Sequence, residues 1–136
     1  MRLIVDTNIV MAALLREGNS RKLLFSKDGD YCSPQRLEVE LEKHWKYILE
    51  KSKLEPSLFE QSADLVLQRI RIVGLEEYEP FEDRARLLCP PGHTDDWPFL
   101  ASALKLNCGL WSEDKALKKQ GQVLVFSTTD LVRLLL

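Results

Sequence analysis

The stretch Leu3-Ile4-Val5-Asp6-Thr7-Asn8 decides the fold, because it combines a short apolar strand with an aspartate at its carboxyl end. Apolar runs of this length are typical of strands in a parallel sheet that helices cover on both faces. A second stretch repeats the pattern, since Gly109-Leu110-Trp111 leads into Ser112-Glu113-Asp114. In such sheets ligands bind beyond the carboxyl ends of the strands, where the strand order reverses. If the two strands are neighbours there, Asp6 and Asp114 face one another across one crevice.

Strand-length runs alternate with stretches of helical spacing along the rest of the chain. The expected strands comprise residues 3–5, 31–32, 71–73, 109–111 and 123–126, and the expected helices comprise residues 9–15, 21–25, 34–49, 58–70, 96–106 and 114–119. Helix starts are marked by Ser33, by Ser57 with Glu60 as a capping box, and by Ser112. The Pro-Pro-Gly sequence within residues 89–93 predicts a loop. With no repeat or linker, the sequence predicts one α/β domain over residues 1–136.

The composition of the 136 residues narrows the class of protein, with 45% hydrophobic and 29% charged residues. The longest apolar run, residues 9–15, is far shorter than the roughly 20 residues of a membrane span. The first residues do not form a secretory signal and the 3 cysteines do not form a disulfide framework, so we expect a cytoplasmic protein without a membrane span. The net charge of -2 excludes a broad basic surface, so any nucleic acid must be held by local basic residues.

An aspartate stands on the apolar face of the helix expected over residues 96–106. At about 100° per residue, Asp96 shares a face with Phe99, Leu100 and Ala103. A carboxylate that points toward the protein interior needs a reason. Asp95 falls about 100° away and is the ordinary candidate for a helix cap.

The helix expected over residues 34–49 contains further acidic residues. Its apolar stripe comprises Leu37, Leu41, His44 and Ile48. Glu38 and Glu40 lie on opposite flanks of that stripe, and periodicity alone does not choose between them. The alternative for the run Glu38, Glu40 and Glu42 is a solvated face.

Four segments, taken in order, resemble the signature segments of PIN-domain ribonucleases. They are Ile4-Val5-Asp6-Thr7-Asn8-Ile9, Ser33-Pro34 with Glu40-Leu41, Asp95-Asp96-Trp97-Pro98-Phe99-Leu100-Ala101-Ser102-Ala103, and Trp111-Ser112-Glu113-Asp114. The likeness extends over the whole chain, including a last strand and a short helix over residues 129–136. It implies a three-layer α/β/α sandwich with a five-stranded parallel sheet, and an acidic pocket in which a divalent metal supports RNA hydrolysis.

The resemblance also assigns roles to residues. The matching catalytic and metal-binding positions are Asp6, Glu40, Asp96 and Asp114, and their polar neighbours are Asn8, Ser112 and Asp95. Many single-domain members of the family are toxins of toxin–antitoxin pairs, which implies an antitoxin protein as a partner. The chain departs from the family at His93, where related segments often have another acid, and this leaves the number of metal ions open.

Four carboxylates in one crevice require either protons or a cation. Two ionised carboxylates about 5 Å apart repel by roughly 3 kcal/mol at an effective dielectric constant of 20. Oxygen ligands favour Mg²⁺ or Mn²⁺, and such an ion lowers the pKa of water and holds phosphate oxygens during hydrolysis. Neither His44 nor His93 has a Cys or His at ligand spacing, so we expect His44 to pack on its helix face and His93 to be a loop residue.

Contacts with an RNA substrate must come from a few basic and aromatic residues. Arg21, Lys22 and Lys115 are candidates for the phosphate backbone, with solvation as the alternative. Trp97 is a candidate for stacking on an unpaired base, with core packing as the alternative.

A metal-dependent endoribonuclease is the leading functional hypothesis, and the alternative is a catalytically silent RNA-binding or scaffold module of the same fold. A phosphatase of small phosphate esters is disfavoured because the chain has no Gly-rich phosphate cradle. The apolar C-terminal tail predicts self-association into a homodimer, because it offers more apolar surface than one short helix usually buries. That tail comprises Leu131, Val132, Leu134, Leu135 and Leu136.

Overall fold

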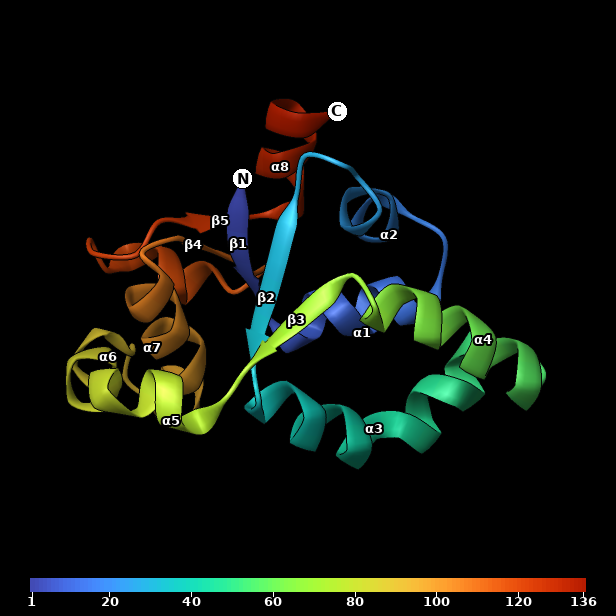
Figure 1. The fold of residues 1–136 in the computed structure, drawn as a ribbon, viewed down its shortest axis with the longest axis horizontal. Coiled ribbons are helices and arrows are strands. Elements are labelled where there is room, and N and C mark those ends of the chain that lie inside the picture. Colours follow the sequence, from blue (N-terminus) through green and yellow to red (C-terminus); the bar gives the residue numbers. More distant parts are fainter.

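The computed structural model describes residues 1–136 and contains one sheet of five strands with helices on both faces (Figure 1). The strands are β1 (Arg2–Val5), β2 (Asp30–Pro34), β3 (Ile70–Val73), β4 (Gly109–Trp111) and β5 (Val125–Phe126). Their order is β3-β2-β1-β4-β5, and every neighbouring pair is parallel. The predicted α/β class and the five-stranded parallel sheet are confirmed.

Successive residues of each central strand point to opposite faces of the sheet, which creates two cores. In β1, Leu3 and Val5 pack in one core and Ile4 packs in the other. The first core is covered by α1 (Thr7–Leu15), α2 (Asn19–Leu24), α3 (Arg36–Ser52), α4 (Pro56–Leu67) and α8 (Thr128–Leu135). The second core is covered by α5 (Leu75–Tyr78), α6 (Glu82–Leu88), α7 (Trp97–Leu106) and the 3-10 turn η3 (Lys115–Lys119). Figure 1 shows these two helical layers on either side of the sheet.

The strand order reverses between β1 and β4. From β1 the chain adds β2 and β3 on one side, and it then returns to place β4 and β5 on the other. Val5 pairs with Trp111, and the backbone N–H of Asp6 donates to the carbonyl of Trp111 at 2.9 Å. The loops that follow β1 and β4 therefore begin side by side, as the sequence analysis required for a shared crevice.

Two predicted helix starts are wrong because the serines bind elsewhere. Ser33 lies inside β2, where its hydroxyl donates to the carbonyl of Val5 at 2.9 Å, and α3 begins only at Arg36. Ser57 lies inside α4, and its hydroxyl donates to Glu55, the residue at the N-cap position, at 3.0 Å. This helix also ends at Leu67, before β3.

The helices between residues 74 and 88 were not expected from the sequence. This segment forms α5, the turn η1 (Glu79–Phe81) and α6, which pack on the second core. Pro80 divides the segment into short pieces. A helical signal was nevertheless present, since Tyr78, Phe81, Ala85 and Leu88 recur at spacings of three and four residues and pack on that core.

His44 does not belong to the buried stripe of α3, so its predicted packing role is wrong. Its side chain is exposed, whereas the neighbouring Trp45 packs edge-on against Phe59 of α4, with ring centroids 5.1 Å apart. The helix turns Trp45 toward α4 because an aromatic ring buries far more apolar surface than an imidazole.

The C-terminal tail is better packed than the sequence suggested. Leu131 is fully buried, and Val132 and Leu135 pack against the first core. Leu134 and Leu136 stay exposed, at 58% and 62% of their surface. α8 is amphipathic and turns one face to its own sheet, so most of the apolar tail is buried within the domain and only Leu134 and Leu136 are left for the predicted self-association. No helix in the structure has the length and apolar character needed to span a membrane.

Candidate active site

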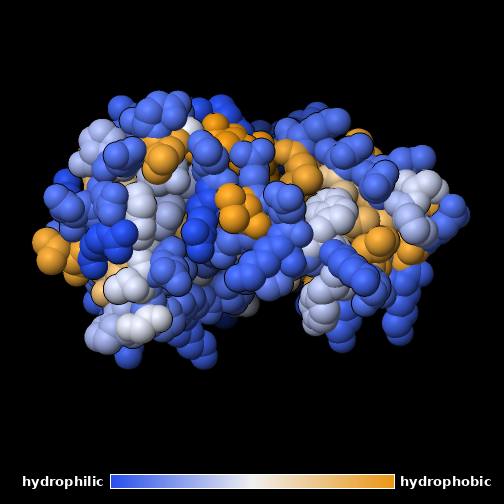
Figure 2. Space-filling view, turned by 90° about the horizontal axis from the view of Figure 1, so that it is seen from below, coloured by the Kyte–Doolittle hydropathy of each residue, from blue (hydrophilic) through white to orange (hydrophobic).

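The four candidate carboxylates all come from segments at the carboxyl ends of the strands. These ends lie at the bottom of Figure 1, and Figure 2 views that face directly, where the surface is mostly hydrophilic with separate hydrophobic patches. Asp6 follows β1, Glu40 lies near the start of α3, Asp96 precedes α7, and Asp114 lies in the loop after β4.

Asp6 is held rigidly and is almost completely buried, with 8% of its surface exposed. Its Oδ1 accepts the backbone N–H of Thr7 at 2.8 Å, which caps α1, and its Oδ2 accepts the hydroxyl of Ser112 at 2.5 Å. The pKa of Asp6 is raised to about 6, chiefly by burial and also by the charges of Asp96 and Glu40, against the opposing hydrogen bonds from Ser112 and Thr7. The fold thus holds a carboxylate where ionisation is costly.

Glu40 faces this site and Glu38 does not. The hydroxyl of Thr7 donates to Oε1 of Glu40 at 2.8 Å, which ties α3 to the start of α1. Glu38 is exposed on the other flank of α3 and lines an apolar recess. The geometry therefore separates two glutamates that helical periodicity left equivalent.

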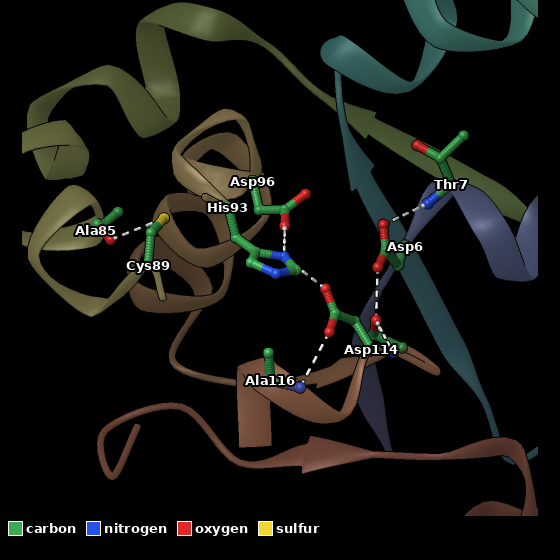
Figure 3. A network of polar contacts seen from close by, with 9 residues as sticks. Asp6, Thr7, Ala85, Cys89, His93, Asp96, Asp114 and Ala116 are labelled. Atoms are coloured by element: carbon green, nitrogen blue, oxygen red, sulfur yellow. Dashed lines mark hydrogen bonds and ion pairs between the residues drawn. The ribbon is translucent and has the colours of Figure 1, made fainter. Parts of the chain in front are cut away.

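His93 lies between Asp96 and Asp114, and Figure 3 shows its ring against both carboxylates. Its Nδ1 is 2.9 Å from Oδ2 of Asp114 and 3.5 Å from Oδ2 of Asp96. His93 lies in a loop, as predicted, but its contact with both carboxylates was not expected from the sequence. The spacing of residues along the sequence did not indicate this contact, because Asp114 lies in the loop after β4 whereas His93 precedes α7.

Asp96 does not cap its helix by a side-chain hydrogen bond, although it stands at the N-cap position of α7. Burial raises the pKa of Asp96, the charge of Asp114 adds to this effect, and His93 opposes it. Two of the four carboxylates are therefore held in surroundings that disfavour their charged form. A cation is the species that would relieve this strain.

Ser112 joins the loops after β1 and β4. Its oxygen accepts the backbone N–H of Asp114 at 3.0 Å while its hydroxyl donates to Asp6. The predicted helix start at Ser112 is wrong, because Asp114 caps η3 by accepting the N–H of Ala116 at 3.0 Å. Ser112 instead fixes the separation of two candidate ligands.

The donor set fits a hard divalent cation. His93, Asp96 and Asp114 each offer one ligand atom, and these atoms lie within 4.8 Å of one another. Glu40 stands outside this trio, yet its charge raises the pKa of both Asp6 and Asp96, so the four acids form one electrostatic unit. Carboxylate oxygens are the ligands that Mg²⁺ and Mn²⁺ prefer, and a single imidazole is compatible with Mn²⁺.

Two predicted polar neighbours stand apart from the carboxylates. The side chain of Asn8 is exposed and makes no hydrogen bond, so it does not orient Asp6. Asp95 is also exposed and forms neither a hydrogen bond nor an ion pair. Ser112 is the predicted neighbour that contacts Asp6.

The predicted substrate contacts are dispersed. Arg21 is half-buried and donates from Nε to the carbonyl of Ala13 at 2.9 Å, with Lys22 exposed beside it. Trp97 packs against Tyr78 and Arg86, with the Tyr78 ring centroid at 5.6 Å and the guanidinium at 5.1 Å. Trp97 therefore packs within the protein, which was the alternative to stacking on an RNA base. Lys115 is exposed directly after Asp114.

A polar recess of about 390 Å³ is lined in part by Asn8 and Glu113, which are near Asp6 and Asp114 in the sequence. Its lining includes Asn8, Arg16, Asn19, Ser20, Glu113 and Thr128. Glu113 accepts the backbone N–H of Thr128 at 2.7 Å, whereas the exposed Arg16 forms no ion pair. Arg16 was not a candidate from the sequence, because only the fold brings it to the same recess as Asn8 and Glu113.

A larger recess of about 820 Å³ is apolar and lies between α3, α4 and β3. Besides Glu38, Glu42 and Lys46, its lining comprises Leu37, Leu41, Trp45, Leu49, Leu67, Ile70 and Ile72. None of the four candidate site carboxylates lines it, so its size does not make it the reaction site.

Comparison with known proteins identifies a family likeness. A family model described as the PIN domain matches residues 4–135. No curated protein sequence matches the chain. Among solved structures, the chain is similar to the crystal structure of VapBC2 from Rickettsia felis bound to a DNA fragment from their promoter, with a TM-score of 0.62 and 18% sequence identity. The match covers 93% of this chain and 98% of that chain, and at this identity it concerns the fold.

Proposed function

The chain belongs to the PIN-domain family, and from this premise we propose that it is a metal-dependent endoribonuclease that hydrolyses RNA phosphodiester bonds. PIN domains are generally nucleases. The observation that carries the proposal is the convergence of Asp6, Glu40, Asp96 and Asp114 beyond the adjacent ends of β1 and β4.

We assign Asp6, Glu40, Asp96 and Asp114 to the binding of Mg²⁺ or Mn²⁺. Such an ion supplies positive charge to the phosphate and acidifies water. The chain's own hydrogen bonds fix the ligands, because Ser112 holds Asp6 and Thr7 holds Glu40. Both hydroxyls are engaged in these bonds, so water rather than a side chain is the expected nucleophile.

The RNA backbone is proposed to run along the polar recess that Asn8 and Glu113 line. Arg16 offers an unpaired guanidinium there, and Asn8 offers an amide on the same wall. Lys115 is exposed next to Asp114 and extends the basic contacts. The net charge of -2 leaves such local contacts as the source of attraction for phosphate.

The test is cleavage of single-stranded RNA by the purified protein. We expect no cleavage in EDTA and recovery on adding Mg²⁺ or Mn²⁺. Asp96→Asn should abolish cleavage, whereas Asp95→Asn should leave it nearly unchanged, because the neighbouring Asp95 is exposed and contacts none of the other acids. Cleavage in EDTA, or full activity of Asp96→Asn, would contradict the proposal. RNA binding without cleavage would instead identify a silent module of the same fold.

We further propose that the chain is the toxin of a toxin–antitoxin pair. The similar VapBC2 structure is a complex of this kind. The apolar recess between α3, α4 and β3 offers a surface for a protein partner, and β3 is an edge strand beside it.

Binding of the product of the adjacent gene tests this partner. Leu49→Lys places a charge in the recess and should weaken binding by at least about tenfold. Leu87→Lys is the matched control, since Leu87 is 87% exposed on α6, on the opposite face of the sheet. Calorimetry gives both dissociation constants. Equal constants for the two variants would exclude the recess as the docking surface.

A further inference from the structure

His93 is presented to the carboxylates by a tight turn. The turn is closed by a hydrogen bond from the backbone N–H of His93 to the carbonyl of Pro90 at 2.9 Å. Gly92 occupies the turn with φ of 82°, a conformation that favours glycine. The carbonyl of His93 then accepts the N–H of Asp96 at 3.1 Å. The imidazole is therefore placed by the backbone on both sides of it.

We propose that His93 is a nitrogen ligand of the metal and makes the site select Mn²⁺ over Mg²⁺. This inference rests on the proposed metal-dependent function and adds a residue and a specificity to it. Mg²⁺ demands oxygen ligands, whereas affinity for imidazole rises along the first transition row from Mn²⁺ onward. An imidazole among the carboxylates therefore favours Mn²⁺ over Mg²⁺, for which carboxylates alone have similar affinity.

The separations of the ligand atoms support one shared ion. Ligands about 2.1 Å from an octahedral ion are about 3.0 Å apart when adjacent and about 4.2 Å apart when opposite. Nδ1 of His93 is 2.9 Å from Asp114 and 3.5 Å from Asp96, and the three ligand atoms lie within 4.8 Å. The trio can therefore converge on one ion with side-chain adjustments alone.

A counter-cation role for His93 predicts the opposite result. If His93 only neutralises Asp96 and Asp114, its removal strengthens the binding of both ions, because their carboxylates become free. If His93 is a ligand, its removal weakens Mn²⁺ and leaves Mg²⁺ nearly unchanged. The sign of the change in affinity distinguishes the two roles.

The experiment is a titration of the whole protein with Mn²⁺ and, separately, with Mg²⁺. Pulsed electron paramagnetic resonance of bound Mn²⁺ detects a coordinated imidazole by its nitrogen coupling. The chain contains 2 histidines, so His44→Asn is the matched control, since His44 is exposed on α3. His93→Asn should abolish the nitrogen coupling and weaken Mn²⁺ binding by at least about tenfold. His44→Asn should change neither.

A second variant tests the selectivity. His93→Asp restores an all-oxygen set and should bind Mg²⁺ at least as tightly as the wild type while losing the preference for Mn²⁺. Wild-type protein that binds Mn²⁺ without nitrogen coupling, coupling that persists in His93→Asn, or stronger binding of both ions by that variant would overturn the inference and leave the proposed function standing. Wild-type protein that binds neither ion would overturn both.

Discussion

Replacing Asp6 with asparagine should abolish RNA cleavage and, in the absence of metal, stabilise the fold. The pKa of Asp6 is raised from 3.8 to about 6, chiefly by burial. The folded state therefore holds this proton more tightly than the unfolded state. As the pH rises from about 4 to 6 the folded protein loses stability, and above pH 6 the ionised carboxylate costs about 3 kcal/mol.

Asparagine removes the charge and keeps a side chain that caps helices well. It disturbs the hydrogen bond from Ser112, at a cost of about 1 kcal/mol. The expected net gain at pH 7.5 is about 2 kcal/mol, and it should shrink as the pH falls below 6 and vanish near pH 4.5, where the remaining cost of ionisation equals the cost of the disturbed hydrogen bond. Urea unfolding in EDTA at pH 7.5 and 4.5 measures both values.

Metal should reverse the order of stability. Mn²⁺ binds the folded wild type and stabilises it by mass action, whereas Asp6→Asn binds the ion poorly and gains little. Cleavage by Asp6→Asn should fall at least about a thousandfold, or roughly 4 kcal/mol of transition-state stabilisation. A variant less stable than the wild type at both pH values without metal would show that Asp6 has a structural role instead.

The parts of the site that follow from local pattern were predicted from the sequence. Asp6 and Asp114 could be placed because each comes after an apolar strand, and Asp96 because it interrupts an apolar helical face. These patterns involve residues that are close in the chain, and hydrophobic periodicity predicts the placement of such residues well.

Contacts that depend on the packing of distant segments could not be predicted from the local pattern. The family resemblance implied that Ser112 is a polar neighbour of the carboxylates, but the local pattern indicated a helix start there, because the contact with Asp6 depends on β1 and β4 being neighbours. The contact of His93 with Asp114 was missed for the same reason, since the turn before α7 brings His93 to a residue that follows β4. Arg16 reaches the polar recess because α1, α8 and the loop after β4 meet there. In each case the partner lies on an element remote in sequence, so spacing gives no signal.

Glu40 and Glu38 test how far the helix register determines the metal site. Both lie on α3, two residues apart, and both are acidic, so their replacement by glutamine changes the net charge equally. Glu40 accepts a hydrogen bond from Thr7, which begins the helix that Asp6 caps, and its charge raises the pKa of Asp6 and Asp96. Glu38 turns to the apolar recess.

We therefore expect Glu40→Gln to weaken Mn²⁺ binding by at least about tenfold, worth roughly 1.4 kcal/mol, and to reduce cleavage while the fold remains intact. Glu38→Gln should leave both nearly unchanged, because an exposed charge on the far flank of α3 is screened by solvent. Titration of Mn²⁺ into the two variants measures the difference. Since the change in net charge is the same, equal losses would mean that only the overall negative field attracts the ion. A larger loss for Glu38→Gln would place the metal on the opposite flank of the helix.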